Sequence, residues 1–142
     1  MKKLSLSYTE YGKMVEELAN KLRDQSFDLI YGMPRGGLPI AVHLSHKLNV
    51  KLVVSKEEVF EYRNKYGTVS LLAVDDIVDT GSTLENLFKN EKGIGRKTAV
   101  LFYKPHASFV PDFYIRETSD WIVFPWEASF EKPNRKMYED LK

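Results

Sequence analysis

The chain has 142 residues, which is enough for one domain with a full hydrophobic core. Apolar residues make up 43% and charged residues 29%, as in ordinary globular proteins, and the formal net charge of +1 gives no basic excess that would indicate a nucleic-acid partner. Cysteine is absent, which excludes disulfides and thiolate metal sites. The sequence also lacks both a signal-peptide pattern and an apolar run near the ~20 residues of a membrane span, so we expect a cytoplasmic protein.

The first predicted elements alternate between helix and strand. Ser7 and Glu10 have capping-box spacing, and apolar residues then recur with helical periodicity to about Arg23. Residues 27–33 are predicted to form the first core strand, and residues 38–48 the next helix. This alternation continues along the chain, so the sequence predicts a single α/β domain with a mostly parallel sheet covered on both faces.

A glycine-rich turn joins the first strand to the second helix. Its residues Arg35, Gly36 and Gly37 are suited to an anion, because the two glycines let backbone amides approach closely and the guanidinium adds a fixed positive fork. The turn is not a Walker A loop, since the Gly-Lys-Ser/Thr ending is missing. Taken alone, such a turn is more often structural than functional.

The segment after the next short strand has no regular period. Residues 51–55 are predicted to be a strand, whereas residues 56–68 mix charged residues with tyrosines. Two interpretations stay open for 56–68: a solvated hairpin or surface loop, or a mobile cover over an active site.

The stretch from Leu71 to Leu84 carries the strongest chemical signal in the chain. An apolar strand runs into Asp75 and Asp76, placed where ligands bind at the carboxyl ends of parallel strands. Two carboxylates there can accept hydrogen bonds from sugar hydroxyls or help to hold a divalent cation. A third carboxylate, Asp79, follows. After it comes a turn with backbone donors and three hydroxyls, Thr80-Gly81-Ser82-Thr83, and the start of a helix there favours a phosphate. Either half alone would fit a solvated strand end or an ordinary helix cap.

The rest of the chain supplies more strands and an aromatic segment. The helix that starts at Leu84 is expected to end at the glycines 93–95, and residues 97–103 and 112–116 are predicted strands. Lys104 follows the first of these strands, and His106 is assigned no role. Segment 120–127 contains Trp121 and Trp126. The apolar residues of the tail are expected to pack on the domain or on a partner subunit: Phe130, Met137, Tyr138 and Leu141.

The stretch from Leu71 to Leu84 resembles the signature for phosphoribosyl pyrophosphate (PRPP) of type I phosphoribosyltransferases. That pattern is an apolar strand, two acidic residues, two aliphatic residues and then Asp-Thr-Gly with hydroxyl residues, and every position is filled here. Lys104-Pro105 and the Trp-Ile...Pro-Trp-Glu segment further resemble the small bacterial xanthine-guanine enzymes of this family. The resemblance covers the chain from about the first helix to Glu127, and departs from the family in a short cover segment and a short tail.

The resemblance implies a role for each matched residue. Asp75 and Asp76 would hold the ribose hydroxyls, and Asp76 is the candidate contact for Mg²⁺. The turn from Thr80 to Thr83 would bind the 5′-phosphate, and the Arg35 turn the pyrophosphate. The remaining matched residues concern the purine: Asp79 as proton acceptor or donor at N7, Lys104 at the exocyclic oxygen, Trp121 stacked on the ring and Ile122 reading the base edge through its backbone.

The expected activity is therefore purine salvage, in which phosphoribose passes from PRPP to N9 of xanthine, guanine or hypoxanthine with Mg²⁺ as cofactor. The resemblance also implies a homo-oligomer, dimer or tetramer. Two alternatives stay open: a non-catalytic regulator that senses PRPP or purines, and an enzyme for another base such as orotate, adenine or uracil.

Overall fold

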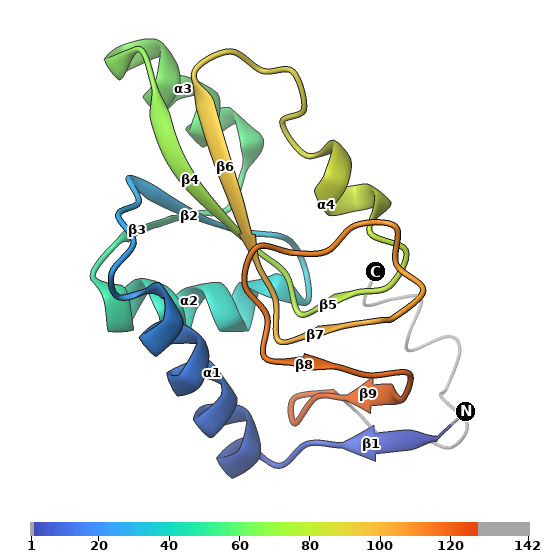
Figure 1. The fold of residues 1–142 in the computed structure, drawn as a ribbon. Coiled ribbons are helices and arrows are strands. Elements are labelled where there is room, and N and C mark those ends of the chain that lie inside the picture. The colour runs from blue at the N-terminus through green and yellow to red at the C-terminus, as the bar shows by residue number, and fades with distance from the viewer. Residues whose placement is uncertain (1, 128–142) are drawn as a thin grey trace, which may run out of the picture.

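The computed structural model describes residues 2–127. Its central feature is a four-stranded parallel sheet in the order β3-β2-β4-β6 (Figure 1). In register, Ile30 lies opposite Leu72, and Leu72 lies opposite Lys97. The bounds of the four strands are Leu29–Gly32 for β2, Lys51–Val53 for β3, Val69–Val74 for β4 and Ile94–Ala99 for β6.

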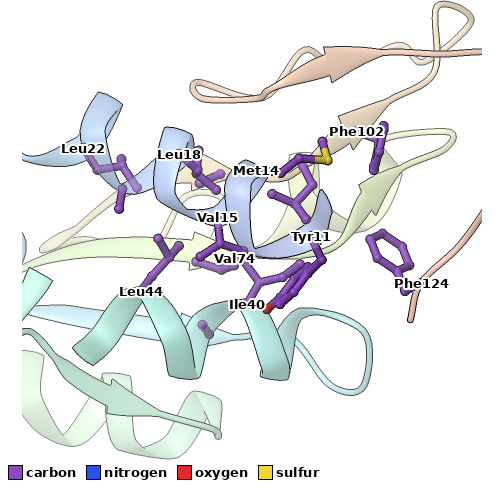
Figure 2. Packing of buried hydrophobic residues seen from close by; sticks show 14 of the residues in the cluster. Tyr11, Met14, Val15, Leu18, Leu22, Ile40, Leu44, Val74, Phe102 and Phe124 are labelled. Carbon is purple, nitrogen blue, oxygen red and sulfur yellow. The ribbon is translucent and has the colours of Figure 1, made fainter. Parts of the chain in front are cut away.

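Helices cover both faces of this sheet. Alternate residues of each strand point to opposite faces, so Ile30 and Leu72 join the core cluster of α1 and α2, whereas Leu29 and Leu71 join that of α3 and α4. Figure 2 shows the first cluster, with α1 packed over α2. The bounds of the helices are Tyr8–Leu22 for α1, Gly37–Leu48 for α2, Lys56–Tyr66 for α3 and Ser82–Asn86 for α4. The predicted three-layer α/β/α architecture is confirmed.

Two strands of the central sheet break and continue in a second parallel sheet. After β4 the chain continues as β5 (Ile77–Val78), and after β6 as β7 (Phe102–Tyr103), which pairs in turn with β8 (Arg116–Glu117). At the break, the backbone carbonyl of Asp76 accepts the N–H groups of Leu101 and Phe102. The prediction of one strand over 97–103 is therefore wrong, because residues 100–101 lie outside both strands: Val100 donates its N–H to the Phe113 carbonyl, and Leu101 donates to the carbonyl of Asp76.

The predicted strand over 112–116 is also largely wrong. Phe113 forms only an isolated bridge with Ala99, and regular pairing begins at Arg116. The N-terminal strand β1 (Lys3–Ser5) instead pairs in parallel with β9 (Trp121–Val123). This pairing places the Trp121 segment beside the start of α1, whose predicted Ser7–Glu10 capping box is confirmed.

Segment 56–68 is mainly helix α3, so the predicted loop or hairpin is wrong. Ser55 and Glu58 form a capping box at its start, and Gly67, with φ of 87°, ends it. The apolar face is narrow because only Val59 is fully buried, which hides the helical period in the sequence. Arg63 donates to the Glu91 carboxylate and to the Lys92 carbonyl, so it secures the turn before β6. A covering role for this segment stays a prediction.

Helix α4 is shorter than predicted. It ends at Asn86 instead of continuing toward the glycines 93–95, because Leu87 is extended and Phe88 has φ of 56°. The guanidinium of Arg96 donates to the carbonyls of Leu84, Glu85 and Leu87, and so satisfies the end of the helix. None of the helices in the described residues is long and apolar enough to cross a bilayer. The predicted packing of Phe130, Met137, Tyr138 and Leu141 lies outside the described residues.

Candidate functional site

The acidic pair lies where β4 leaves the central sheet. Asp75 donates its backbone N–H to the Ala99 carbonyl, and its carboxylate accepts the backbone N–H of Asp76 at 2.9 Å. The Asp76 carboxylate accepts the backbone N–H of Ile77 at 2.8 Å. These bonds hold both carboxylates at the carboxyl edge of the sheet, as the sequence predicts.

The two carboxyl groups differ in their surroundings. Burial, and then the neighbouring Asp76 carboxylate, raise the pKa of Asp75 to about 8. A carboxyl group with this pKa is mostly protonated at pH 7, so Asp75 can donate a hydrogen bond as well as accept one. A cation or a hydrogen-bond donor arriving beside it would favour its ionised form.

The Arg35 turn packs directly against this acidic pair. A Cβ placed on Gly36 would overlap Oδ2 of Asp76, and one on Gly37 would overlap the Val74 carbonyl oxygen. Only glycine permits this approach, which brings the turn after β2 to the strand end of β4. Arg35 itself is exposed, and the Pro34–Arg35 peptide bond is cis. The structure thus joins the two anion-binding segments that the sequence predicts separately.

A pocket of about 140 Å³ opens between β5 and α4. Its polar lining comes from the predicted signature: Asp75, Asp79, Thr80, Gly81 and Thr83. Gly81 takes φ of 94°, and the hydroxyls of Thr80 and Ser82 lie 3.2 Å apart. Because α4 has only five residues, the turn with its hydroxyls and amides, more than a long helix dipole, suits this place to a phosphate. The volume is below the roughly 300–1,000 Å³ of complete small-molecule sites, so it fits one part of a larger ligand.

The predicted purine residues lie together in a neighbouring segment. Lys104 is buried, and its ammonium donates to the Asp120 carbonyl at 2.6 Å and to the Ser119 carbonyl at 3.4 Å. Trp121, the residue after Asp120, is 57% exposed. None of Lys104, Trp121 and Ile122 lines the 140 Å³ pocket. The backbone N–H of Lys104 donates to the carbonyl of Val78 at 2.9 Å, which places this group beside the residue that precedes Asp79.

Ile122 can offer only its backbone to a ligand. Its side chain is buried in the core, whereas the ladder with β1 uses the N–H of Trp121 and the carbonyl of Val123. In a parallel ladder, the backbone groups of alternate residues point to opposite edges of a strand. The N–H and carbonyl of Ile122 therefore point away from β1, which is the orientation that backbone recognition of a ligand needs.

The sequence interpretation missed one residue of the site. Nε2 of His106 lies 2.9 Å from Oδ1 of Asp79. The signal that could have found it is the parallel pairing of β5 with β7, in which Val78 lies opposite Tyr103, because residues just beyond two paired strands emerge at the same edge.

Comparison with known proteins agrees with this geometry. The family model described as "Phosphoribosyl transferase domain" matches residues 7–132. The chain belongs to the phosphoribosyltransferase family. It has the type I fold of that family, with the acidic pair and the Thr80–Thr83 turn in one site.

Three relatives place the chain within the family. A xanthine-guanine phosphoribosyltransferase of Idiomarina loihiensis is 29% identical over 139 residues, which covers 86% of this chain and 85% of the relative. A purine phosphoribosyltransferase structure from Pyrococcus horikoshii is 34% identical with a TM-score of 0.76, and the match covers 94% of this chain and 100% of that one. An orotate phosphoribosyltransferase of Archaeoglobus fulgidus is 31% identical over 107 residues, which covers 70% of this chain and 60% of the relative.

Proposed function

We propose that this protein is a purine-salvage enzyme that transfers phosphoribose from PRPP to N9 of a 6-oxopurine. The observation that carries the choice of base is the bond between the buried Lys104 ammonium and the carbonyl of Asp120, directly before the exposed Trp121. This bond keeps a cation and an open aromatic face in one segment. The purine specificities named for the relatives from Idiomarina loihiensis and Pyrococcus horikoshii support the same choice.

The purine would be bound by stacking and by polar contacts at its edge. Trp121 offers a flat apolar surface to the heterocycle. Lys104 has three ammonium protons, and the two carbonyls at 2.6 and 3.4 Å occupy two of them, so one proton is left for the exocyclic oxygen. Adenine presents an amino group at that position, which a cationic donor does not favour. The outward N–H and carbonyl of Ile122 would read the remaining base edge.

The sugar and phosphates would be bound by the remaining site residues. Asp75 and Asp76 would bind the ribose hydroxyls, and the turn from Thr80 to Thr83 the 5′-phosphate. Arg35 and the amides of the Gly36-Gly37 turn would stabilise charge on the departing pyrophosphate. No protein nucleophile is required, so catalysis would come from positioning and electrostatics.

Asp79 would act as the general base for the purine. As N9 of the purine forms its bond to the sugar carbon, the bond from that carbon to pyrophosphate breaks, and the carboxylate of Asp79 would accept the proton released from N7. Asp79 lines the same pocket as the phosphate turn (Thr80 to Thr83), and its side chain is 69% exposed, so its carboxylate is open to a bound purine.

The acidic pair fits Mg²⁺ bound together with substrate. Within residues 2–127, no cluster of three or more His, Cys, Asp or Glu side chains could hold a metal by itself. Mg²⁺ commonly uses one or two carboxylates plus substrate phosphates, and we propose Asp76 as its protein contact. When bound, the ion supplies positive charge that neutralises pyrophosphate oxygens.

The test is release of pyrophosphate from PRPP with Mg²⁺ and, in separate reactions, guanine, xanthine, hypoxanthine, adenine or orotate. Release with one or more 6-oxopurines alone is the expected result. Release with orotate, which the Archaeoglobus fulgidus relative makes the main alternative, would overturn the roles of Lys104 and Trp121. Folded protein that binds PRPP but releases nothing with any base would point to a regulator.

Asp79→Asn should lower kcat about 100-fold or more with little change in PRPP affinity.

A further inference from the structure

The loop after β7 is hydrogen-bonded to the phosphate turn at Ser108 and packed against it at Phe109. The N–H and the hydroxyl of Ser108 both donate to the carbonyl of Thr80, at 3.0 and 3.2 Å. Phe109 then packs on the next residue of the turn, since a Cβ on Gly81 would lie 2.6 Å from the Phe109 Cβ. On its other side, the ring of Phe109 faces the Arg96 guanidinium at 5.6 Å. The backbone of this loop is therefore held at a set distance from the phosphate turn.

His106 reaches the signature from this fastened loop. Its Nε2 lies 2.9 Å from Oδ1 of Asp79, and Ala107, the next residue, donates its N–H to the Lys104 carbonyl at 3.0 Å to close the turn. The side chains of His106 and Asp79 are 64% and 69% exposed, so this bond does not serve the core. An exposed contact of this kind adds little to folding stability, which leaves the orientation of Asp79 as its main consequence.

We propose that His106 is a positioning residue that orients Asp79 for phosphoribosyl transfer. Nε2 carries a proton in imidazolium and in one neutral tautomer, and in both forms it can donate to Oδ1 of Asp79. With Oδ1 held in this way, Oδ2 remains as the acceptor for the purine proton. A second group that fixes the base in this manner is a recurrent feature of proton-transfer sites. This inference rests on the proposed function, because it assigns Asp79 the proton.

The geometry also predicts which kinetic constant changes. His106 contacts Asp79, whereas the phosphate turn is held through Ser108 and Phe109. Loss of the imidazole should therefore leave PRPP binding unchanged and reduce the chemical step. A loss confined to kcat, with unchanged KM for PRPP, means that an interaction made in the transition state has been removed.

The experiment compares wild type with His106→Ala, His106→Gln and Asp79→Asn, and with the double variant His106→Ala/Asp79→Asn, in the pyrophosphate-release assay. His106→Ala should lower kcat about 10-fold with the KM for PRPP unchanged, since positioning a general base is part of its overall contribution of 10²–10⁴. His106→Gln should recover much of the loss, because its amide N–H reaches about as far as Nε2. The histidine change should have almost no further effect in the Asp79→Asn background. The matched control is His46→Ala, which removes an exposed histidine of α2.

The outcomes separate this inference from the function on which it rests. Wild type active on 6-oxopurines, with His106→Ala equally active, would overturn the positioning role alone. So would a raised KM for PRPP at unchanged kcat, or an undiminished histidine effect in the Asp79→Asn background. A wild type that turns over no base would instead overturn the proposed function and the positioning role with it. If His106→Ala does not fold, His106→Asn, whose shorter side chain falls short of Asp79, takes its place with the same expected loss.

Discussion

Replacing Asp75 by Asn should make the protein's stability less sensitive to pH. Burial and the Asp76 carboxylate raise the Asp75 pKa from 3.8 to about 8, so the folded chain binds more protons at this residue than the unfolded chain between those two values. Stability therefore decreases as pH rises through this window and levels off above about 8. The substituted asparagine cannot ionise, and its amide oxygen can still accept the Asp76 N–H, so this contribution to the slope should disappear.

The size of the effect follows from the pKa difference. One pKa unit corresponds to about 1.36 kcal/mol, so the three units from pH 5 to pH 8 set a ceiling of roughly 4 kcal/mol. Asp75 lines an open pocket, and water there screens its charge, so we expect about half of this ceiling, ~2 kcal/mol. From pH 5 to pH 8, the unfolding free energy of Asp75→Asn should therefore rise by ~2 kcal/mol relative to that of wild type.

The assay is urea unfolding at half-unit pH steps, with the free energy of unfolding obtained by linear extrapolation. Asp24→Asn, which changes an exposed carboxylate, is the control and should remain within about 0.5 kcal/mol of wild type at every pH. Parallel curves for Asp75→Asn and wild type would refute the reasoning, because they would mean that Asp75 is ionised in the folded protein throughout this range.

Three further substitutions test the architecture of the site. Gly37→Ala should destabilise the fold by about 1–3 kcal/mol, since the new Cβ would overlap the Val74 carbonyl oxygen. The control Gly12→Ala, with open space around its Cβ, should be neutral or stabilising. Equal melting temperatures of the two variants would contradict this expectation. Arg96→Met should lower the unfolding free energy by about 1–3 kcal/mol, because three carbonyls lose their donor, and a urea midpoint like that of wild type would count against it. Trp121→Ala should raise the KM for the purine about 10-fold, since base–aromatic stacking is worth about 1–3 kcal/mol. The fold should stay intact because the ring is exposed. An unchanged KM would remove Trp121 from the base site.

The part of the site that the sequence predicts is local in the chain. Asp75, Asp76 and the turn from Thr80 to Thr83 follow one buried strand within a few residues, so the strand end and the turn alone bring them close together. The α1 capping box is predictable for the same reason, because its two partners are three residues apart. Short-range geometry of this kind depends little on the rest of the fold.

The contacts between distant segments were decided by the tertiary structure. β4 and β6 break together because the Asp76 carbonyl takes its donors from residues 101 and 102, and no local pattern of either strand contains that information. Helix α3 has so narrow a buried face that its period is weak in the sequence, and packing on the sheet decides its burial.

By itself, therefore, the sequence determined the layer architecture and the order of the PRPP signature, since hydrophobic period, capping and strand-end chemistry act over a few residues. Only the tertiary structure placed the Arg35 turn against Asp76, tied Lys104 to the residue before Trp121 and brought His106 to Asp79. Each of these contacts joins residues that follow different strands or turns. Their proximity depends on parallel pairing and loop closure, which are properties of the whole fold.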